Sequence, residues 1–175
     1  NLLEDKPEVP HYEVVSIPLG KIGSEVYSLR ASTEKPPYPF VLVTGGTGCG
    51  KSAFMHEIIL SGAYKYSPDE LEFHVIDFKS ADKATEFADY QYGKKMYIPH
   101  IKYLSLKSRP ENALDILNYI QKLKSKRNRM GKFKSYNESN PSKKMPLIYV
   151  IIDEYESMLA GGETAGNSYE ATMLQ

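Results

Sequence analysis

The chain has 175 residues, of which 41% are hydrophobic and 25% charged, and these values are ordinary for a single globular domain. Lys plus Arg and Asp plus Glu both number 22, so the zero formal net charge removes the argument for a strongly basic nucleic-acid-binding domain. A single cysteine, Cys49, excludes an internal disulfide and indicates a reducing, cytoplasmic setting, and no apolar run of about 18 residues is present to span a membrane.

The first predicted elements form a hairpin. Residues 12–18 (YEVVSIP) and 25–29 (EVYSL) have the β-branched or alternating character of short strands, with Gly20 and Gly23 marking the turn between them. Three prolines then make residues 31–39 (ASTEKPPYP) a loop, because proline removes a backbone donor and fixes φ.

The segments that follow alternate between strands and helices. Residues 40–44 (FVLVT) form a uniformly apolar run, typical of a strand that is buried on both faces of a parallel sheet. A helix is predicted from Ser52, a strand over 71–78, a short strand over 98–104 and an amphipathic helix over 109–130.

The last segments are a loop, a strand and a tail. Residues 132–144 are polar and predict a solvent-exposed loop, whereas residues 146–152 (PLIYVII) form the most hydrophobic strand of the chain. Strands that alternate with helices predict an α/β fold: a mainly parallel sheet with helices on both faces, preceded by the short N-terminal hairpin. Ligands of such sheets bind at the carboxyl ends of the strands.

A complete phosphate-binding pattern, G-x-x-x-x-G-K-[S/T], lies between the apolar run and the helix. Its glycines allow successive backbone N–H groups to face inward as an anion nest, and the following helix directs its positive end at the same point. The lysine then reaches the β- and γ-phosphates of ATP, and the serine hydroxyl binds Mg²⁺. The predicted nucleotide-binding residues are Gly45, Gly46, Thr47, Gly48, Cys49, Gly50, Lys51 and Ser52.

A second motif closes the last strand with two carboxylates, Asp153 and Glu154. In a P-loop ATPase the first would hold Mg²⁺ through its water shell, and the second would orient the attacking water. A solvated acidic turn after a core strand is the structural alternative, and the upstream phosphate-binding pattern favours the catalytic interpretation. Lys51, Asp153 and Glu154 are therefore the predicted catalytic residues, with Ser52 and Asp153 as the metal ligands.

Other polar residues leave two interpretations open. Asp77 and Lys79 end the strand over 71–78, where they are either close to the magnesium and phosphate or form a surface ion pair. His56 and His74 fit packing or surface positions better than ligand positions, and either interpretation fits His100. Basic residues between 122 and 144 form either a solvated face or a contact for nucleic acid or a neighbouring subunit. Arg109, Arg127 and Arg129 are candidates for an arginine that acts on a neighbouring subunit's nucleotide.

The chain resembles the FtsK/SpoIIIE-type branch of the RecA-like motor ATPases. The resemblance covers roughly residues 12–159 and depends on these stretches: 17–21 (IPLGK), 43–52 (VTGGTGCGKS), 67–71 (SPDEL), 75–79 (VIDFK), 98–100 (IPH) and 151–155 (IIDEY). It implies a RecA-like P-loop NTPase that uses ATP and Mg²⁺, self-associates into a ring, usually a hexamer, and in most cases moves double-stranded DNA. A related branch drives protein export in type VII secretion.

The resemblance also divides the chain. Residues 1–39 would be the hairpin and proline-rich lead, 40–160 the ATPase core, and 161–175 a flexible tail that begins a further C-terminal part with the polar sensor and the DNA-tracking loops. This segment would not insert into a membrane, although the parent protein could be anchored through other segments. Cys49 and residues 124–127 (KSKR) depart from the residues that the family commonly has.

The motifs and the resemblance leave three alternative functions. The main prediction is an ATPase that moves double-stranded DNA, with an isolated fragment of weak activity. The first alternative is an ATPase of a type VII protein secretion system, with a protein as the substrate. The second is a nucleotide-binding module that has lost turnover and serves as an assembly platform.

Overall fold

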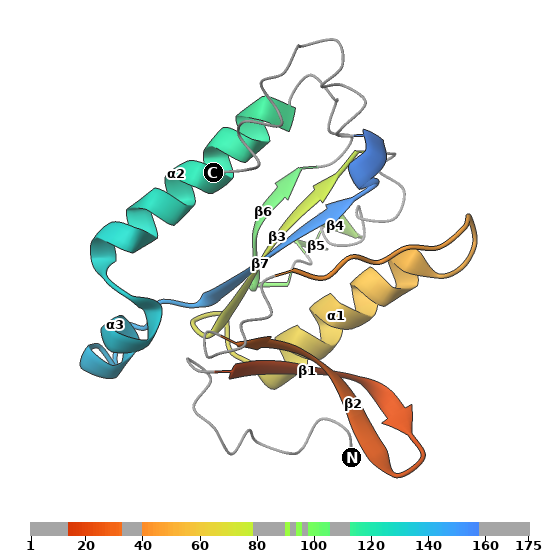
Figure 1. Cartoon of the computed structure of the whole chain (residues 1–175), viewed down its shortest axis with the longest axis horizontal. Coiled ribbons are helices and arrows are strands. Elements are labelled where there is room, and N and C mark those ends of the chain that lie inside the picture. Colours follow the sequence, from red (N-terminus) through yellow and green to blue (C-terminus); the bar gives the residue numbers. More distant parts are fainter. Residues whose placement is uncertain are drawn as a thin grey trace. The chain divides into compact units, whose positions relative to one another are not determined.

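The computed structural model describes residues 14–32, 40–78, 90–91, 94–95, 98–105 and 113–157 (Figure 1). The helices and strands in these ranges are, in chain order, β1 (Val14–Ile22), β2 (Glu25–Ser32), α1 (Lys51–Lys65), β3 (Leu71–Asp77), β4 (Tyr90–Gln91), β5 (Lys94–Lys95), β6 (Ile101–Ser105), α2 (Ala113–Met130), α3 (Phe133–Ser139) and β7 (Leu147–Asp153).

Strands β6, β3 and β7 form a three-stranded sheet in that order, and they point the same way (Figure 1). The non-consecutive order means that crossover connections join them, as a parallel sheet requires. Helices flank this sheet, so the predicted α/β class with a mainly parallel sheet is confirmed. The chain divides into two compact units, Asn1–Phe73 with Phe133–Tyr149 and His74–Lys132 with Val150–Gln175, so β3 and β7 each contribute to both units.

The predicted hairpin is confirmed in the first unit. Strand β1 pairs with β2 in antiparallel register from Val14 opposite Ser32 to Ile22 opposite Glu25. The turn contains Gly23, whose φ of 65° lies in the left-handed region that glycine adopts without strain. Gly20 was expected at the turn but lies inside β1, where the register shifts at a bulge.

Helix α1 packs closely in the first unit. Its buried side chains include Met55, Ile58 and Ile59. A Cβ atom added at Gly62 would lie 2.8 Å from Phe73 Cζ and 2.9 Å from Leu71 Cδ2, which is closer than ordinary van der Waals contact. Glycine at this helical position therefore lets α1 approach β3, at the cost in helix propensity that glycine carries.

The C-terminal end of α1 is attached to the hairpin by Tyr66. Its hydroxyl accepts a hydrogen bond from Ser16 N at 2.8 Å and lies 3.2 Å from Ser16 O, to which it donates. Burial raises the pKa of Tyr66 above its usual value, so the phenol keeps its proton, and with it the bond to Ser16 O, to higher pH than an exposed tyrosine would. Tyr66 thus adds a polar contact to the packing between the hairpin and the helix that follows the phosphate-binding pattern, where Ile17 of β1 lies close to Gly62 of α1.

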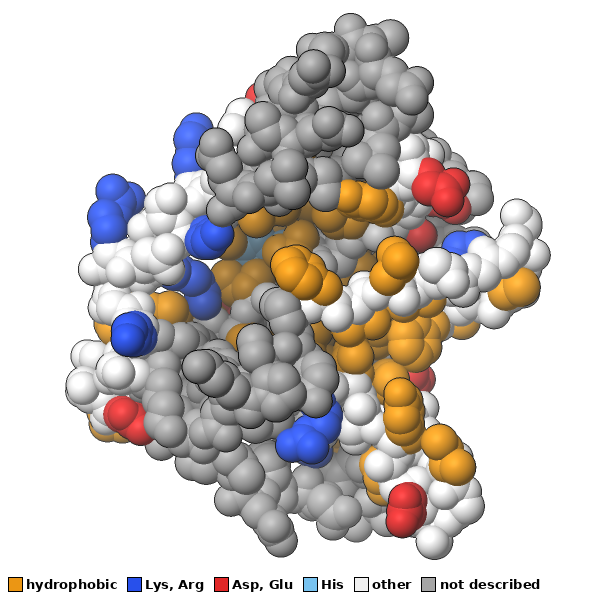
Figure 2. Space-filling model, in the orientation of Figure 1, with side chains coloured by type: hydrophobic (Ala, Val, Ile, Leu, Met, Phe, Trp, Pro, Cys, Tyr) orange, Lys and Arg blue, Asp and Glu red, His pale blue; other side chains and the backbone are white. Residues whose placement is uncertain are grey.

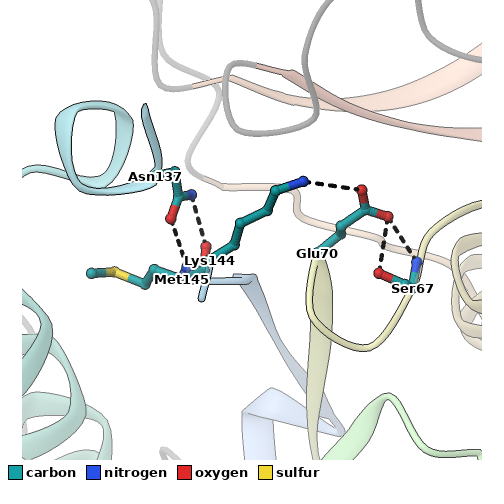
Figure 3. Close-up of polar contacts among 5 residues, drawn as sticks. All are labelled: Ser67, Glu70, Asn137, Lys144 and Met145. Atoms are coloured by element: carbon teal, nitrogen blue, oxygen red, sulfur yellow. Dashed lines mark hydrogen bonds and ion pairs between the residues drawn. The ribbon is translucent and has the colours of Figure 1, made fainter. Parts of the chain in front are cut away.

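The polar segment over 132–144 was predicted to be a loop, and this was wrong in part because α3 occupies Phe133–Ser139. Asn137, which is 1% exposed, explains the ordered structure: its Nδ2 donates to Met145 O at 2.9 Å and its Oδ1 accepts from Met145 N at 2.6 Å (Figure 3). The loop was predicted from the polar sequence of this segment. That pattern does not reveal that one side-chain amide bonds both backbone groups of another residue.

A second polar contact in Figure 3 lies at the start of β3. Glu70 Oε2 accepts hydrogen bonds from Ser67 N and Ser67 Oγ at 2.9 and 3.1 Å, and Glu70 Oε1 lies 4.0 Å from Lys144 Nζ. Leu147 N donates to Glu70 O at 2.9 Å, which joins the beginnings of β3 and β7. This turn therefore positions the two strands in the first unit.

The core of the second unit is formed by β3, β6, α2 and β7. The buried side chains of Ile76 and Phe78 are packed against partly buried hydrophobic residues, namely Tyr103, Leu117, Ile120, Val150, Ile152 and Tyr155. The predicted amphipathic helix is confirmed over Ala113–Met130, and residues 109–112 of the prediction lie outside the described residues. Strand β6 begins at Ile101 rather than at residue 98, because Ile101 N donates to Ile98 O in a turn that contains Pro99.

The prediction of a buried strand over residues 40–44 is wrong. These residues form no strand, and the exposed fractions are 90% for Phe40, 54% for Val41, 81% for Leu42 and 44% for Val43. The apolar, β-branched composition predicts a preference for extended backbone, but a strand also needs a paired neighbour, and pairing depends on distant residues. The side chains lie exposed along the segment that leads to α1 (Figure 2).

Candidate nucleotide-binding site

The glycine-rich loop before α1 has the backbone geometry of an anion nest. Gly48 and Gly50 have φ values of 82° and 88°, in the left-handed region, and Cys49 between them donates its N–H to Gly46 O at 3.3 Å. Alternation between right- and left-handed conformations turns successive N–H groups toward one point. The glycines at these positions are therefore needed for their backbone conformation.

The N-terminus of α1 adds to this geometry. Gly50 is its N-cap, no side chain caps the helix, and the first turn contains no acidic residue. The first intrahelical bond runs from Phe54 N to Gly50 O at 2.9 Å, so the preceding N–H groups of the helix have no intrahelical acceptor. Together with the helix dipole, these donors favour an anion at the loop.

Lys51 lies over the loop from the first position of α1. Its Nζ donates to Gly45 O at 2.6 Å and to Gly46 O at 3.2 Å. The ammonium group is thus held at the loop by two backbone carbonyls, where it can exchange them for phosphate oxygens.

The remaining predicted phosphate-binding residues lie in the same loop. Thr47 and Cys49 are exposed, Ser52 is partly buried in the first turn of α1, and a Cβ atom added at Gly45 would lie 3.4 Å from Cys49 Cβ. A cysteine is tolerated here because the backbone supplies the binding groups.

The acidic pair ends β7 in the second unit. Asp153 and Glu154 are both partly buried, and Glu154 N donates to Asp153 Oδ1 at 3.0 Å. Phe78 N donates to Asp153 O at 3.3 Å, which joins the carboxyl ends of β3 and β7. Asp77, which ends β3 and is 2% exposed, therefore lies on the strand next to that of Asp153.

Among the described non-glycine residues, Glu154 alone has a positive φ, of 56°. A left-handed glutamate costs of order 1 kcal/mol, and such strain is concentrated at functional sites. The backbone changes direction here, since Ser157 N donates to Glu154 O at 2.9 Å in the short turn after β7. The carboxylate pair could be predicted from the sequence, whereas this conformation could not, because glutamate gives no sign of a left-handed position.

The other candidate residues fall into three groups. His74 and His100 are buried, and His74 Nδ1 lies 3.2 Å from Tyr119 Oη in a stack of aromatic rings with Tyr103, which favours a packing role for His74. His56 is partly buried in α1. Lys79 and Arg109 lie outside the described residues.

The basic residues between 122 and 144 are divided between the two units. Those of α2 belong to the second unit, whereas Lys143 and Lys144 belong to the first, where Lys144 lies near Glu70. Three exposed basic residues of α2, Lys122, Lys126 and Arg129, are spaced by four and three positions and so share one helical stripe. Figure 2 shows Lys and Arg side chains at the edge of the view where α2 lies in Figure 1.

The donor set fits Mg²⁺. In nucleotide sites this ion takes one or two protein oxygens, and water and phosphate oxygens complete its octahedron. Within the described ranges no group of three or more His, Cys, Asp or Glu residues could hold a metal. The Ser52 hydroxyl and the Asp153 carboxylate are oxygen donors of the kind that Mg²⁺ prefers.

Among the helices that the structure describes, none is both long enough and apolar enough to span a bilayer.

Comparison with protein families gives one match: a model described as the FtsK/SpoIIIE family matches residues 1–145. The DNA translocase FtsK of Helicobacter pylori is 32% identical over 154 residues, which cover 82% of this chain and 17% of that protein. The type VII secretion system protein EssC of Staphylococcus aureus is 29% identical over 158 residues, which cover 84% of this chain and 10% of EssC.

A solved structure has a similar fold. The cytoplasmic domain of the type VII secretion ATPase EccC of Thermomonospora curvata aligns with a TM-score of 0.58 and 21% identity, over 91% of this chain and 19% of that one. The chain thus spans less than a fifth of each of these relatives.

Proposed function

Because the chain belongs to the FtsK/SpoIIIE family, we propose that it is the ATP-binding and ATP-hydrolysing motor domain of a translocase that couples hydrolysis to the movement of double-stranded DNA. The observation that carries the proposal is the phosphate loop. Positive φ values at Gly48 and Gly50, an uncapped helix N-terminus and a lysine over the loop make up a site for a nucleotide's phosphates.

The roles of the loop residues follow from their chemistry. Backbone N–H groups of Gly45, Gly46, Thr47, Gly48, Cys49 and Gly50 surround the phosphates. Lys51 moves from the carbonyls of Gly45 and Gly46 to the β- and γ-phosphate oxygens, and the Ser52 hydroxyl is a ligand for Mg²⁺. When bound, the ion neutralises charge on the phosphate oxygens.

The acidic pair supplies the remaining roles. Asp153 holds the metal's water shell, and Glu154 orients the attacking water and accepts its proton. The left-handed backbone at Glu154 fixes where its carboxylate emerges from the end of β7. Asp77, buried at the end of the neighbouring strand, supports the position of Asp153.

The same proposal assigns the segments of the chain. Residues 1–39 lead into the domain, and residues 40–160 form the ATPase core. The motor works as a ring, in the cytoplasm, with double-stranded DNA as its partner. The similarity to the H. pylori DNA translocase supports DNA as the polymer.

Protein export is the second candidate function. The similarity to EssC and the EccC-like fold support it. The sequence Asp77-Phe78-Lys79 also favours that branch, or relatives from mobile elements, over the chromosome-segregating translocases, which usually have Pro at the middle position. A module that binds nucleotide without turnover is the third. The intact set of Lys51, Ser52, Asp153 and Glu154 argues against it.

The test is the ATPase rate of the longer protein that contains this domain, measured with and without double-stranded DNA at low and moderate salt. A DNA motor is stimulated by DNA, and the stimulation weakens with salt because cation release drives the contact with phosphates. Turnover that is indifferent to DNA would favour protein export, and an absence of turnover would favour the assembly module.

A further inference from the structure

The turn end of the hairpin carries exposed apolar side chains on both of its faces. Ile22 and Val26 are 70% and 42% exposed. Ile22 lies opposite Glu25 and shares its face of the hairpin, whereas Val26, the next residue along β2, faces the other side. We call this turn end the apolar wedge. Both of its faces are removed from water only when it is inserted between two walls.

An apolar cavity of about 640 Å³ lies in the same unit, bounded by β2, the segment 40–44 and α1. Its lining includes Tyr27 and Leu29 of β2, Phe40 and Leu42 of the segment, and Phe54 of α1. Tyr27 and Leu29 are two residues apart on the strand and therefore face the same side. Since Phe40 and Leu42 are 90% and 81% exposed, the cavity is open to water, and we call it the apolar groove.

The wedge does not occupy the groove of its own chain. Neither Ile22 nor Val26 lines the groove, and the turn end of the hairpin projects away from α1 in Figure 1. Figure 2 shows hydrophobic side chains at the surface both on the hairpin and along the segment. Each copy of the chain therefore presents one wedge and one groove, which differ in shape and share their apolar character.

We propose that the wedge of one copy inserts into the groove of a second copy. The proposal rests on the proposed function, because it identifies a contact between neighbouring subunits of the ring. A contact between two different surfaces leaves one wedge and one groove open, so it continues from copy to copy and forms a ring where the rotation closes. A contact between two wedges would stop at two copies.

Charge and apolar area both favour a second copy as the occupant. The formal net charge is zero, so copies of the chain do not repel one another, and the exposed Lys21 and Glu25 at the turn end have opposite signs. A standard interface buries about 1,600 Å² over both partners, with an apolar centre. The wedge and the groove together supply this centre with large side chains that are each at least 42% exposed, namely Ile22, Val26, Tyr27, Phe40, Val41, Leu42 and Val43.

The experiment measures self-association of the 175-residue chain by sedimentation equilibrium over a range of concentrations. Ile22→Ser changes the wedge and Leu42→Ser changes the groove. Leu60→Ser is the matched control, because Leu60 is a 53% exposed apolar residue of α1 that does not line the groove. All three side chains are more than half exposed, so their replacement leaves the core intact.

We expect the unmodified chain and Leu60→Ser to associate reversibly and to the same extent. Ile22→Ser and Leu42→Ser should each weaken association by about tenfold, as the loss of one buried aliphatic side chain predicts. The Ile22→Ser chain keeps an intact groove, and the Leu42→Ser chain keeps an intact wedge. An equimolar mixture of the two should therefore form pairs with one copy of each and should not grow beyond two copies.

Three results would overturn the proposal: an unmodified chain that stays monomeric, variants that associate like the Leu60→Ser control, or a mixture that associates no better than its components. ATP binding to the same chain, measured by calorimetry, separates this outcome from failure of the proposed function. A monomer that binds ATP would remove the wedge-and-groove contact and leave the nucleotide site. Association without ATP binding would contradict the proposed function and leave the contact.

Discussion

At the residue scale, backbone conformation matters as much as side-chain identity. Glu154 follows Asp153 with a φ of 56°, and its N–H is bonded to the Asp153 carboxylate. The glutamate side chain therefore leaves the strand in a direction that an extended residue would not have. In the proposed mechanism, this direction sets the point at which the carboxylate accepts a proton from water.

Replacement of Glu154 by Gln should separate nucleotide binding from hydrolysis. The amide has nearly the same shape but cannot accept the proton, so we expect kcat to fall by about 10²–10⁴-fold while ATP affinity stays within about twofold. ATPase rates and ATP binding of the longer protein measure the two effects. The control is Glu156→Gln, an exposed glutamate two residues further on. Unchanged turnover in Glu154→Gln would remove the water-orienting role from this residue.

The buried hydroxyl of Tyr149 leads to a prediction about how the stability of the fold depends on pH. Its hydroxyl is buried, without a hydrogen-bond partner among the residues that the structure describes, and burial raises the pKa of Tyr149 above its usual value, with nearby Tyr66 adding to the shift. The folded chain therefore keeps a proton that the unfolded chain loses above about pH 10. Stability is full below that pH and declines as pH rises above it.

We expect Tyr149→Phe to raise the free energy of unfolding by about 1 kcal/mol at pH 7, because it removes a buried hydroxyl that has no partner. The loss of stability above pH 10 should also become smaller. Urea unfolding at pH 7 and pH 10.5 measures both effects, with Tyr64→Phe as the exposed control. Lower stability of Tyr149→Phe at pH 7 would mean that the hydroxyl has a favourable contact.

At the scale of elements, the sequence predicts the helices and strands that have a recognisable pattern of apolar residues within their own segment. The hairpin, α1, α2, β3 and β7 all have a periodic or apolar pattern that identifies them, and the glycine-rich loop has its motif. Three features could not be predicted: α3, the unpaired state of residues 40–44, and the left-handed Glu154. Each depends on something that the hydrophobic pattern does not contain: the side-chain bonds of Asn137 to Met145, the lack of a paired neighbour for residues 40–44, and the short turn after β7 at Glu154.

Asn137 provides a test of that account. Asn137→Ala leaves the buried N–H and C=O of Met145 without this partner, so we expect it to lower the free energy of unfolding by roughly 2–3 kcal/mol. Asn137→Asp keeps the acceptor for Met145 N but loses the donor to Met145 O. Asn128→Ala, at an exposed position of α2, is the control for removing an amide. Equal stability of Asn137→Ala and the parent chain in urea would contradict the anchoring role.

At the scale of the whole molecule, the formal net charge is zero, but the basic residues are not evenly distributed along the chain. Acidic and basic residues are equal in number, yet Lys122, Lys126 and Arg129 share one exposed stripe of α2. Such a stripe is either a solvated face or a contact for the phosphates of DNA. The two alternatives differ in how binding depends on salt.

If the stripe contacts DNA, changing its three residues to Gln should reduce the slope of log K against log salt by about 2–3, because each lost phosphate contact removes about 0.9. DNA binding of the longer protein is measured over a range of salt concentrations. Gln at Lys21, Arg30 and Lys102, three exposed basic residues on the separate strands β1, β2 and β6, gives a control of equal charge change. The same slope in both triple variants would show that the stripe does not contact DNA.

The exposed run Phe40–Val43 has a consequence for the behaviour of the chain in solution. Four consecutive apolar residues without charge or proline, outside any strand, have the β-prone, uncharged composition of segments that pair between molecules, but they are fewer than the roughly six or seven residues that such a segment needs. Pro36, Pro37 and Pro39 directly precede the run and cannot donate backbone hydrogen bonds. We expect these prolines to limit the run upstream, as the glycine-rich loop limits it downstream. The exposed apolar segment before the phosphate loop is thereby kept shorter than an aggregation-prone segment.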